Sequence, residues 1–557
     1  MKRSNTSSVV TGARAESSML FSSMFFFLLA MAPAHAQPKA MLTHHTRDAV
    51  SSGQAAHVGR LSATQILRLD IALPLRNEAQ LDEELQQLYD RNSSSYHQFL
   101  SVEQFTERFA PSKQDYDAVI HFAQANGLTV TGTTPNRMLV NVVGPVANIE
   151  RAFHVALNVY QHPTEARTFY APDREPTADL STPLWHVSGL DNFSIPHPAS
   201  LRHEPEVKSG PAATGSGPNG YFLGSDMRVA YYGGSALTGS GQSVGLLEFA
   251  GYNINDVNNY FSRVGQPLTV PVVGVSTDGS SLSCTGSCDD TEQVLDIEVA
   301  ISMAPALSSV RVYVSDTSDV SMFNRMATDN ISKSLSCSWG WSPADPTSDD
   351  PIFKEFAAQG QNLFVASGDS GAYSKRSRFV YPADDPYVTS VGGTDLTTSG
   401  GGGPWKSETA WSSSGGGVSP NKIAIPSYQK TSGVITTANR GSTIYRNSPD
   451  VAAEGNTDNF ICYNGTCAGG WGGTSFAAPR WAGYLALANQ QSVAHGLGTL
   501  GFINPTLYQI GLGSSYGTNF HDITSGSNGS YSSQKGYDLV TGWGSPNGSG
   551  LIYTLAP

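Results

Sequence analysis

One short stretch near the C-terminus combines the features of a serine nucleophile. Gly473-Thr474-Ser475 precedes an apolar, alanine-rich run, which predicts a turn that places Ser475 at the start of a helix. The backbone N–H groups and the positive dipole end of such a helix favour a developing oxyanion. Pro479 is expected in the first helical turn, where its missing N–H does little harm.

A nucleophilic serine needs a base, and the distribution of histidines argues against the usual one. Of the 13 histidines, eleven lie at or before His203, and only His495 and His521 follow. Both late histidines come after Ser475, and neither lies in a motif typical of a catalytic histidine. We therefore expect the base of Ser475 to be a different residue type.

Carboxylates offer such a base. Glu292 and Asp296 are four residues apart in an expected helix that ends at Pro305, so their side chains share one face. Apolar neighbours predict that this helix is largely buried, and two like charges there raise at least one pKa. A functional pair and a solvated acidic face explain the spacing about equally well.

A third carboxylate follows an expected buried strand. Asp369 lies in Ser367-Gly368-Asp369-Ser370-Gly371, directly after the apolar run 362–366. Sites in open parallel sheets form beyond the carboxyl ends of the strands. Asp369 is therefore either a group held beside the nucleophile or an ordinary turn aspartate.

The surrounding chain divides into parts of different character. Residues 1–36 combine basic residues, a short apolar run and a small-residue cleavage site, which predicts a signal peptide, and so a secreted protein, rather than a membrane anchor. Residues 37–203 alternate helix-like and strand-like segments, as in a compact α+β unit. Residues 204–220 are mostly small and uncharged and read as a linker and processing region. Residues 221–557 alternate apolar strands and helices, as in an α/β domain with a parallel sheet.

The cysteines and the net charge limit the cellular compartment and the kinds of partner that we expect. Cys284 and Cys288, like Cys462 and Cys467, could each close a small disulfide loop, which fits an oxidising compartment; a metal site is the alternative. The formal net charge of −13 argues against a nucleic-acid partner. No other stretch is long and apolar enough for a stable membrane span, and we expect a monomer.

Taken together, these motifs resemble the sedolisins, the acid-active serine-carboxyl peptidases related to subtilisin. The resemblance is carried by Glu292-x-x-Leu295-Asp296-Ile297-Glu298, Ser336-Cys337-Ser338-Trp339-Gly340, the Asp369 turn and Gly473-Thr474-Ser475. Residues 37–203 resemble a pro-kumamolisin-type activation domain, including Tyr96-His97-Gln98-Phe99-Leu100 and Pro135-Asn136-Arg137-Met138. The resemblance implies a subtilisin-like parallel sheet flanked by helices, preceded by a smaller ferredoxin-like prodomain that acts as an intramolecular inhibitor.

The resemblance also implies residue roles. Ser475 would be the nucleophile, Glu292 its general base, Asp296 the residue that orients this base, and Asp369 the oxyanion stabiliser. Supporting positions are Glu248, which extends the carboxylate chain, and Trp339, for which a core role is nearly as well supported. One Ca²⁺ would be bound by the side chains of Asp522 and Asp538 and by the carbonyls of Ile523, Gln534 and Gly536.

The leading expectation is thus a secreted, acid-active endopeptidase, made as a zymogen, that hydrolyses proteins or peptides. A histidine-dependent subtilisin-type protease is disfavoured by the positions of the late histidines. A tripeptidyl peptidase of the same family is an alternative, because the catalytic motifs do not separate endo from exo action. An inactive, secreted peptide-binding protein is a second alternative, against which the complete catalytic set argues.

Overall fold

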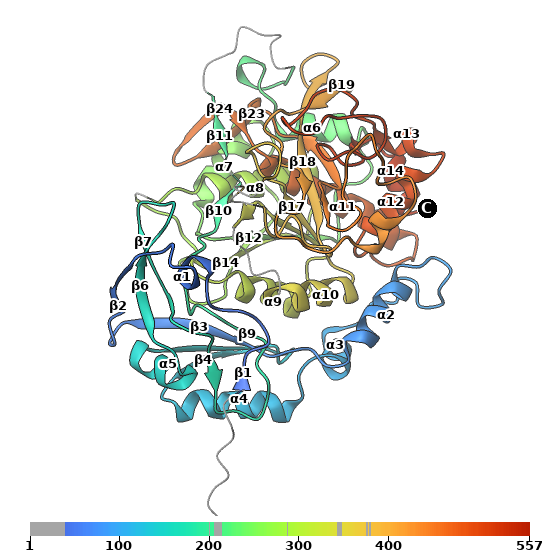
Figure 1. Cartoon of the computed structure of the whole chain (residues 1–557). Helices are drawn as coiled ribbons and strands as arrows, with labels where there is room; N and C mark the ends of the chain where they lie inside the picture. Colours follow the sequence, from blue (N-terminus) through green and yellow to red (C-terminus); the bar gives the residue numbers. More distant parts are fainter. Residues whose placement is uncertain are drawn as a thin grey trace, which may run out of the picture.

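The computed structural model describes residues 39–199, 201–204, 214–286, 288–341, 348–374, 377 and 380–557. It shows a smaller N-terminal part packed beneath a larger α/β part (Figure 1). The expected signal segment 1–36 and residues 205–213 of the expected linker lie outside the described residues.

An eight-stranded sheet forms the framework of the larger part. Seven strands run in the order β13-β14-β12-β15-β17-β18-β19, and β22 also pairs with β18. All pairs are parallel except β18 with β19. The predicted subtilisin-like parallel sheet is confirmed. Its strands are β12 (Ser243–Glu248), β13 (Val272–Ser276), β14 (Ser309–Val314), β15 (Ser334–Cys337), β17 (Asn362–Ala366), β18 (Thr389–Thr398), β19 (Trp405–Ala410) and β22 (Val451–Glu454).

Helices cover both faces of this sheet (Figure 1). On one face, α8 (Thr291–Met303) packs along α11 (Thr474–Ala494), and α11 crosses β15 and β17. On the face toward the N-terminal part lie α9 (Asp319–Asp329) and α10 (Asp350–Ala358). Every residue of α8 is buried, because α11, α6 (Gly224–Tyr231), α7 (Ile254–Arg263) and β23 (Asn459–Tyr463) surround it.

The N-terminal part is built on an antiparallel four-stranded sheet in the order β4-β5-β3-β9. This order and the intervening helices match a ferredoxin-like unit. The N-terminal part has an apolar core separate from that of the α/β part. A second sheet, of β2, β6 and β7, extends the N-terminal part. The elements are β2 (His57–Arg60), β3 (Ile66–Ala72), α4 (Lys113–Ala125), β4 (Thr129–Thr133), β5 (Leu139–Pro145), α5 (Val146–Phe153), β6 (Leu157–Gln161), β7 (Thr168–Pro172) and β9 (His186–Ser188).

Apolar and polar contacts dock the two parts. The apolar face of α2 (Glu78–Leu88) joins the core of the α/β part, and its contacts continue into α3 (Val102–Arg108). The Asn136 amide is fully buried and donates to Asn324 Oδ1 (2.7 Å) and Glu355 Oε2 (2.8 Å). Asp70 accepts a short hydrogen bond from the Ser318 hydroxyl. The interface is therefore specific as well as apolar.

Part of the expected linker and processing region, residues 204–220, is bound to the α/β part. Thr214 hydrogen-bonds Thr398 of β18 through backbone and side chain, and Ser216 binds the Asp226 carboxylate. These tertiary hydrogen bonds fix the second half of the segment although its composition is typical of a loop. Upstream, β10 (His197–Pro198) and β11 (Arg202–His203) already pair with strands of the α/β part.

In the described part of the chain, no helix has the length and apolar character needed to cross a membrane.

Candidate active site

Ser475 is the second residue of α11, and its side chain is fully buried. Gly473 precedes the helix with an extended backbone. A Cβ at Gly473 would lie 2.8 Å from Asp369 Oδ2 and 3.2 Å from Leu201 Cδ1. Glycine is therefore needed here for close approach, and it lets the Ser475 turn lie against Asp369.

Pro479 lies in the second turn of α11, so its expected place in the first turn was wrong. In an α-helix the N–H of residue 479 would bond to the carbonyl of Ser475, and proline has no N–H. The Ser338 hydroxyl lies 3.4 Å from that carbonyl oxygen. Pro479 thus frees the Ser475 carbonyl to interact with the neighbouring strand end.

A chain of buried carboxyl groups reaches Ser475 from α8. The Ser338 hydroxyl donates to Asp296 Oδ1 at 2.8 Å, and the Trp339 indole donates to Glu248 Oε2 at 2.9 Å. The Ser475 hydroxyl lies close enough to the Glu292 carboxyl to lower its pKa. No hydrogen bond of normal geometry joins the two groups. The structure thus brings Ser475, Glu292, Asp296, Glu248 and Trp339 into one cluster.

Burial shapes the protonation of this cluster. It raises the pKa of Glu292 well above its ordinary value, and repulsion from Asp296 raises it further. Burial also raises the pKa of Asp296 and of Glu248 well above the ordinary range. The three carboxyl groups therefore share protons, and a proton leaving Ser475 can pass to Glu292 only when Glu292 is the ionised member.

Asp369 is held by the residue that precedes the serine. The Thr474 N–H donates to Asp369 Oδ1 at 2.7 Å and the Thr474 hydroxyl does so at 2.9 Å. Asp369 Oδ2 is buried and has no hydrogen-bond partner among the described residues. Burial raises the pKa of Asp369 to about 7, against the lowering effect of the Thr474 hydrogen bonds. In acid this carboxyl is protonated and can donate a hydrogen bond.

The end of the N-terminal part reaches this site in two described pieces, which contain β10 and β11. Pro198 pairs with Trp339, and the Ala199 N–H donates to the Ser338 carbonyl at 3.1 Å. Beyond Ser475 the direction is kept, because Arg202 pairs antiparallel with Gly472 of β24 (Thr466–Gly472). Residues 197–199 and 201–204 thus lie on the two sides of the serine.

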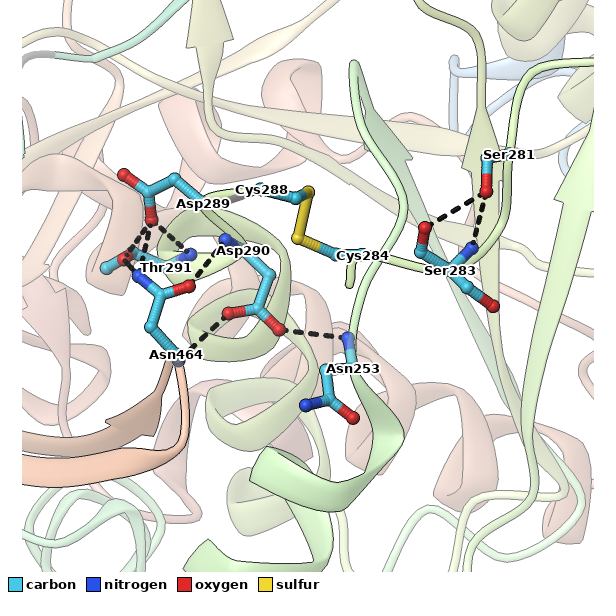
Figure 2. The surroundings of a disulfide bond; sticks show 9 residues. All are labelled: Asn253, Ser281, Ser283, Cys284, Cys288, Asp289, Asp290, Thr291 and Asn464. Atoms are coloured by element: carbon cyan, nitrogen blue, oxygen red, sulfur yellow. Dashed lines mark hydrogen bonds between the residues drawn. A yellow bond between two sulfur atoms is a disulfide. The ribbon is translucent and has the colours of Figure 1, made fainter. Parts of the chain in front are cut away.

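The start of α8 is anchored to the hairpin formed by β23 and β24. The two predicted cysteine pairs are joined as disulfides, Cys284 to Cys288 and Cys462 to Cys467. Figure 2 shows the first of them beside Asp290, which accepts from the Asn464 N–H at 3.1 Å and from the Asn253 N–H at 2.9 Å. The second disulfide closes the hairpin tip that carries Asn464. Both bridges thus support the segment from which Glu292 projects.

The two late histidines lie away from the site. His495 is at the far end of α11, where its Nδ1 contacts the Pro557 carbonyl at 2.8 Å. Twenty residues of helix separate it from Ser475, a distance of about 30 Å. His521 stacks on Trp405 with ring centroids 3.9 Å apart. His495 is therefore too far to serve as the base of Ser475, and His521 makes no hydrogen bond to it.

Two contacts join four of the five expected calcium ligands. Asp522 Oδ1 accepts from the Gly536 N–H at 3.1 Å, and Asp538 Oδ2 accepts from the Gln534 N–H at 3.1 Å. The carbonyls of Ile523, Gln534 and Gly536 accept no hydrogen bond among the described residues. Two carboxylates joined through one loop, with carbonyl oxygens left over, suit a hard cation such as Ca²⁺.

Sequence reasoning left two residues of the site without a role. Ser338 was quoted within its motif, but only the structure places its hydroxyl between Asp296 and the Ser475 carbonyl. Thr474 fixes Asp369 and also accepts from the Gly368 N–H at 3.0 Å. Two signals in the sequence could have pointed to them: Thr474 directly precedes Ser475, and Ser338 lies within a family motif.

Comparison with known proteins agrees with this geometry. Residues 53–193 match the family described as "Pro-kumamolisin, activation domain", and residues 307–496 match the "Subtilase family". Kumamolisin of Bacillus sp. (strain MN-32) is 32% identical over 563 residues, which cover 94% of this chain and 97% of that protein. The chain belongs to the sedolisin family and is kumamolisin-like. It is a serine-type peptidase with an activation prodomain.

Other sedolisin relatives span most of the chain as well. Sedolisin of Pseudomonas sp. (strain 101) is 30% identical and covers 89% of this chain and 88% of its own length. Tripeptidyl-peptidase 1 of Canis lupus familiaris is 29% identical, covering 89% and 93%. The structure of Pseudomonas sedolisin complexed with two molecules of pseudo-iodotyrostatin aligns with a TM-score of 0.53 and 26% identity, covering 62% of this chain and 98% of that one.

Proposed function

We propose that this sedolisin-family zymogen is a secreted, acid-active serine-carboxyl endopeptidase that works through an acyl-enzyme on Ser475. The observation that carries the proposal is the position of Ser475 between the Glu292 carboxyl chain and Asp369, with a peptide strand lying across it. The predicted signal peptide and the two disulfides favour secretion.

In the acylation step, Ser475 Oγ attacks the carbonyl carbon of the scissile peptide and its proton passes to Glu292. Glu292 accepts only in its ionised form, so in the active enzyme the protons of the buried chain must lie on Asp296 and Glu248. Protonated Asp369 and the Ser475 N–H donate to the oxyanion. The C–N bond breaks, the amine takes the proton from Glu292, and water then hydrolyses the acyl ester by the same route.

Endopeptidase action is favoured over tripeptidyl-peptidase action by the strand in the cleft. The strand enters from the folded prodomain and continues past Ser475 to Glu204, whose N–H donates to the Gly470 carbonyl at 2.8 Å. The same cleft therefore accommodates peptide on both sides of the serine. We further propose that self-processing begins between Pro198 and Arg202, upstream of the region expected at 204–220, because the described residues on the two sides of Ser475 end there.

We also propose one Ca²⁺ held by Asp522, Asp538 and the carbonyls of Ile523, Gln534 and Gly536. The ion would supply positive charge that ties the segment 534–538 to Asp522. These residues take no part in the proposed reaction, so the role of the ion would be stability rather than chemistry.

Peptide hydrolysis at pH 3–5 compared with pH 8, with and without a serine-targeted peptide aldehyde, tests the main proposal. We expect hydrolysis in acid that the aldehyde blocks. N-terminal sequencing of the acid-treated protein locates the cut. Hydrolysis at pH 8 alone, or cleavage products that are all tripeptides, would contradict the proposed endopeptidase.

A further inference from the structure

Residues 202–204 also show which surfaces the cleft offers to side chains that follow the scissile bond. Residues 202–204 follow the serine in the chain direction, so in a substrate their place belongs to the leaving peptide. Strand β11 pairs with β24 (Figure 1), with Arg202 opposite Gly472 and His203 opposite Trp471. Successive side chains of a strand point to opposite faces, so Arg202 and His203 meet different surroundings.

Arg202 turns toward the Asp369 side of the cleft. Its guanidinium donates to the Asp369 carbonyl at 3.0 Å and lies 5.8 Å from the Trp411 ring centroid. The cavity there has a volume of about 300 Å³ and polar walls that include Asp395 and Asn456. This side accepts a long polar side chain.

His203 instead lies flat on an aromatic surface. Its ring is stacked on Trp471, with centroids 4.2 Å apart and planes 7° from parallel. Tyr463 meets the Trp471 ring edge-on at 4.8 Å and reaches toward His203 at 6.4 Å. Trp471 and Tyr463 thus form a platform, which we call the aromatic platform.

The aromatic platform is rigid, as a binding surface must be. Tyr463 and Trp471 lie on the antiparallel strands of the hairpin closed by the Cys462–Cys467 disulfide. Trp471 packs below against Leu295 of α8 and Phe476 of α11. The hairpin tip is held through Asn464 to the start of α8 (Figure 2). Its rings are therefore fixed relative to Glu292 and Ser475.

We propose that the aromatic platform is a substrate subsite that selects an aromatic or imidazole side chain in the leaving peptide, within about three residues after the scissile bond. This inference rests on the proposed peptidase activity and assigns its specificity beyond the cut. In the zymogen His203 occupies the subsite, and in the processed enzyme the side chain of a substrate takes its place. Stacking on a fixed ring favours planar side chains over aliphatic ones of similar size.

The test compares peptides that differ only at the position aligned with His203. The acid-processed protein is given peptides with Phe, His, Leu or Ala there, and mass spectrometry confirms the same cut in each. We expect kcat/KM for Phe and His to exceed that for Ala by about three- to tenfold, with Leu between. Trp471→Phe should keep the preference, whereas Trp471→Ala should bring the Phe-to-Ala ratio close to one.

Tyr553→Ala removes an exposed aromatic ring on α14 (Gly550–Leu555) and serves as the matched control, with the preference unchanged. Equal kcat/KM for all four peptides in the wild type would overturn the subsite. So would a Trp471→Ala enzyme that loses activity on every peptide by the same factor, since this would mark Trp471 as structural. Should Trp471→Ala fail to fold, Trp471→Leu tests the same ratio. Hydrolysis without preference refutes the subsite alone, whereas no hydrolysis of any peptide refutes the proposed function and the subsite with it.

Discussion

Asn136 offers a test of how the prodomain is held on the catalytic domain. Its buried amide is the only group of the Pro135–Met138 turn with hydrogen bonds to both Asn324 and Glu355 in the described structure. Asn136→Ala removes both hydrogen bonds and leaves two buried polar atoms without this partner. Each such loss costs about 1–3 kcal/mol, so we expect docking to weaken by about 2–6 kcal/mol.

This loss is about 30- to 20,000-fold in the docking equilibrium. We therefore expect the Asn136→Ala precursor to process itself faster than wild type and at a higher pH. The assay follows the appearance of the processed chain by gel electrophoresis across pH 3–8. Asn148→Ala is the matched control, because the Asn148 amide makes a comparable hydrogen bond, to the Gly127 carbonyl at 2.9 Å, away from the interface. An Asn136→Ala precursor that folds and processes with wild-type rate and pH midpoint would refute the reasoning.

Three further predictions follow from single residues. Asp369→Ala should lower kcat about 10²- to 10³-fold by removing an oxyanion donor, and Asp369→Asn, which can still donate, should lose less; equal losses in acid peptide hydrolysis would contradict the role. Burial lowers the pKa of His97 to about 4. Between that value and about 6.5 the unfolded prodomain binds more protons than the folded one, so the folding stability of the prodomain falls as pH drops through this range. His97→Gln should therefore move the processing midpoint to lower pH, unlike the exposed His121→Gln; an unmoved midpoint would dismiss His97 as a trigger. Chelation at neutral pH should lower the melting temperature of wild type but not of Asp538→Ala, and equal shifts would remove the calcium assignment.

Much of the fold could be predicted because local patterns and tertiary packing agree. The buried strand Val244–Glu248 and the helix carrying Glu292 and Asp296 read as apolar runs of the right period, and the structure places both in the core. Residues 204–220 are expected to be a linker from their composition, which does not show that hydrogen bonds to Thr398 and Asp226 hold their second half. Composition reports local preference and does not contain such contacts.

The site, like the fold, could be predicted from the sequence only in part. Its carboxylates and serine could be found because the types and spacing needed for chemistry are unusual in a buried helix and a glycine turn. The place of Pro479 was predicted wrongly by one helical turn. Because it lies in the second turn, the carbonyl that loses its helical partner is that of Ser475. The platform of Tyr463 and Trp471 could not be predicted, because it depends on how the hairpin and the prodomain strand lie together.

The central claim is that a carboxyl group, and not a histidine, is the base of Ser475. The most direct measurement is kcat/KM at pH 4 for Glu292→Gln and His495→Ala, with each precursor processed by a trace of wild-type enzyme whose contribution is subtracted. We expect Glu292→Gln to lose several orders of magnitude, as nucleophile–base pairs do, and His495→Ala to keep most activity. A folded His495→Ala enzyme without activity, or a Glu292→Gln enzyme near the wild-type rate, would contradict the account.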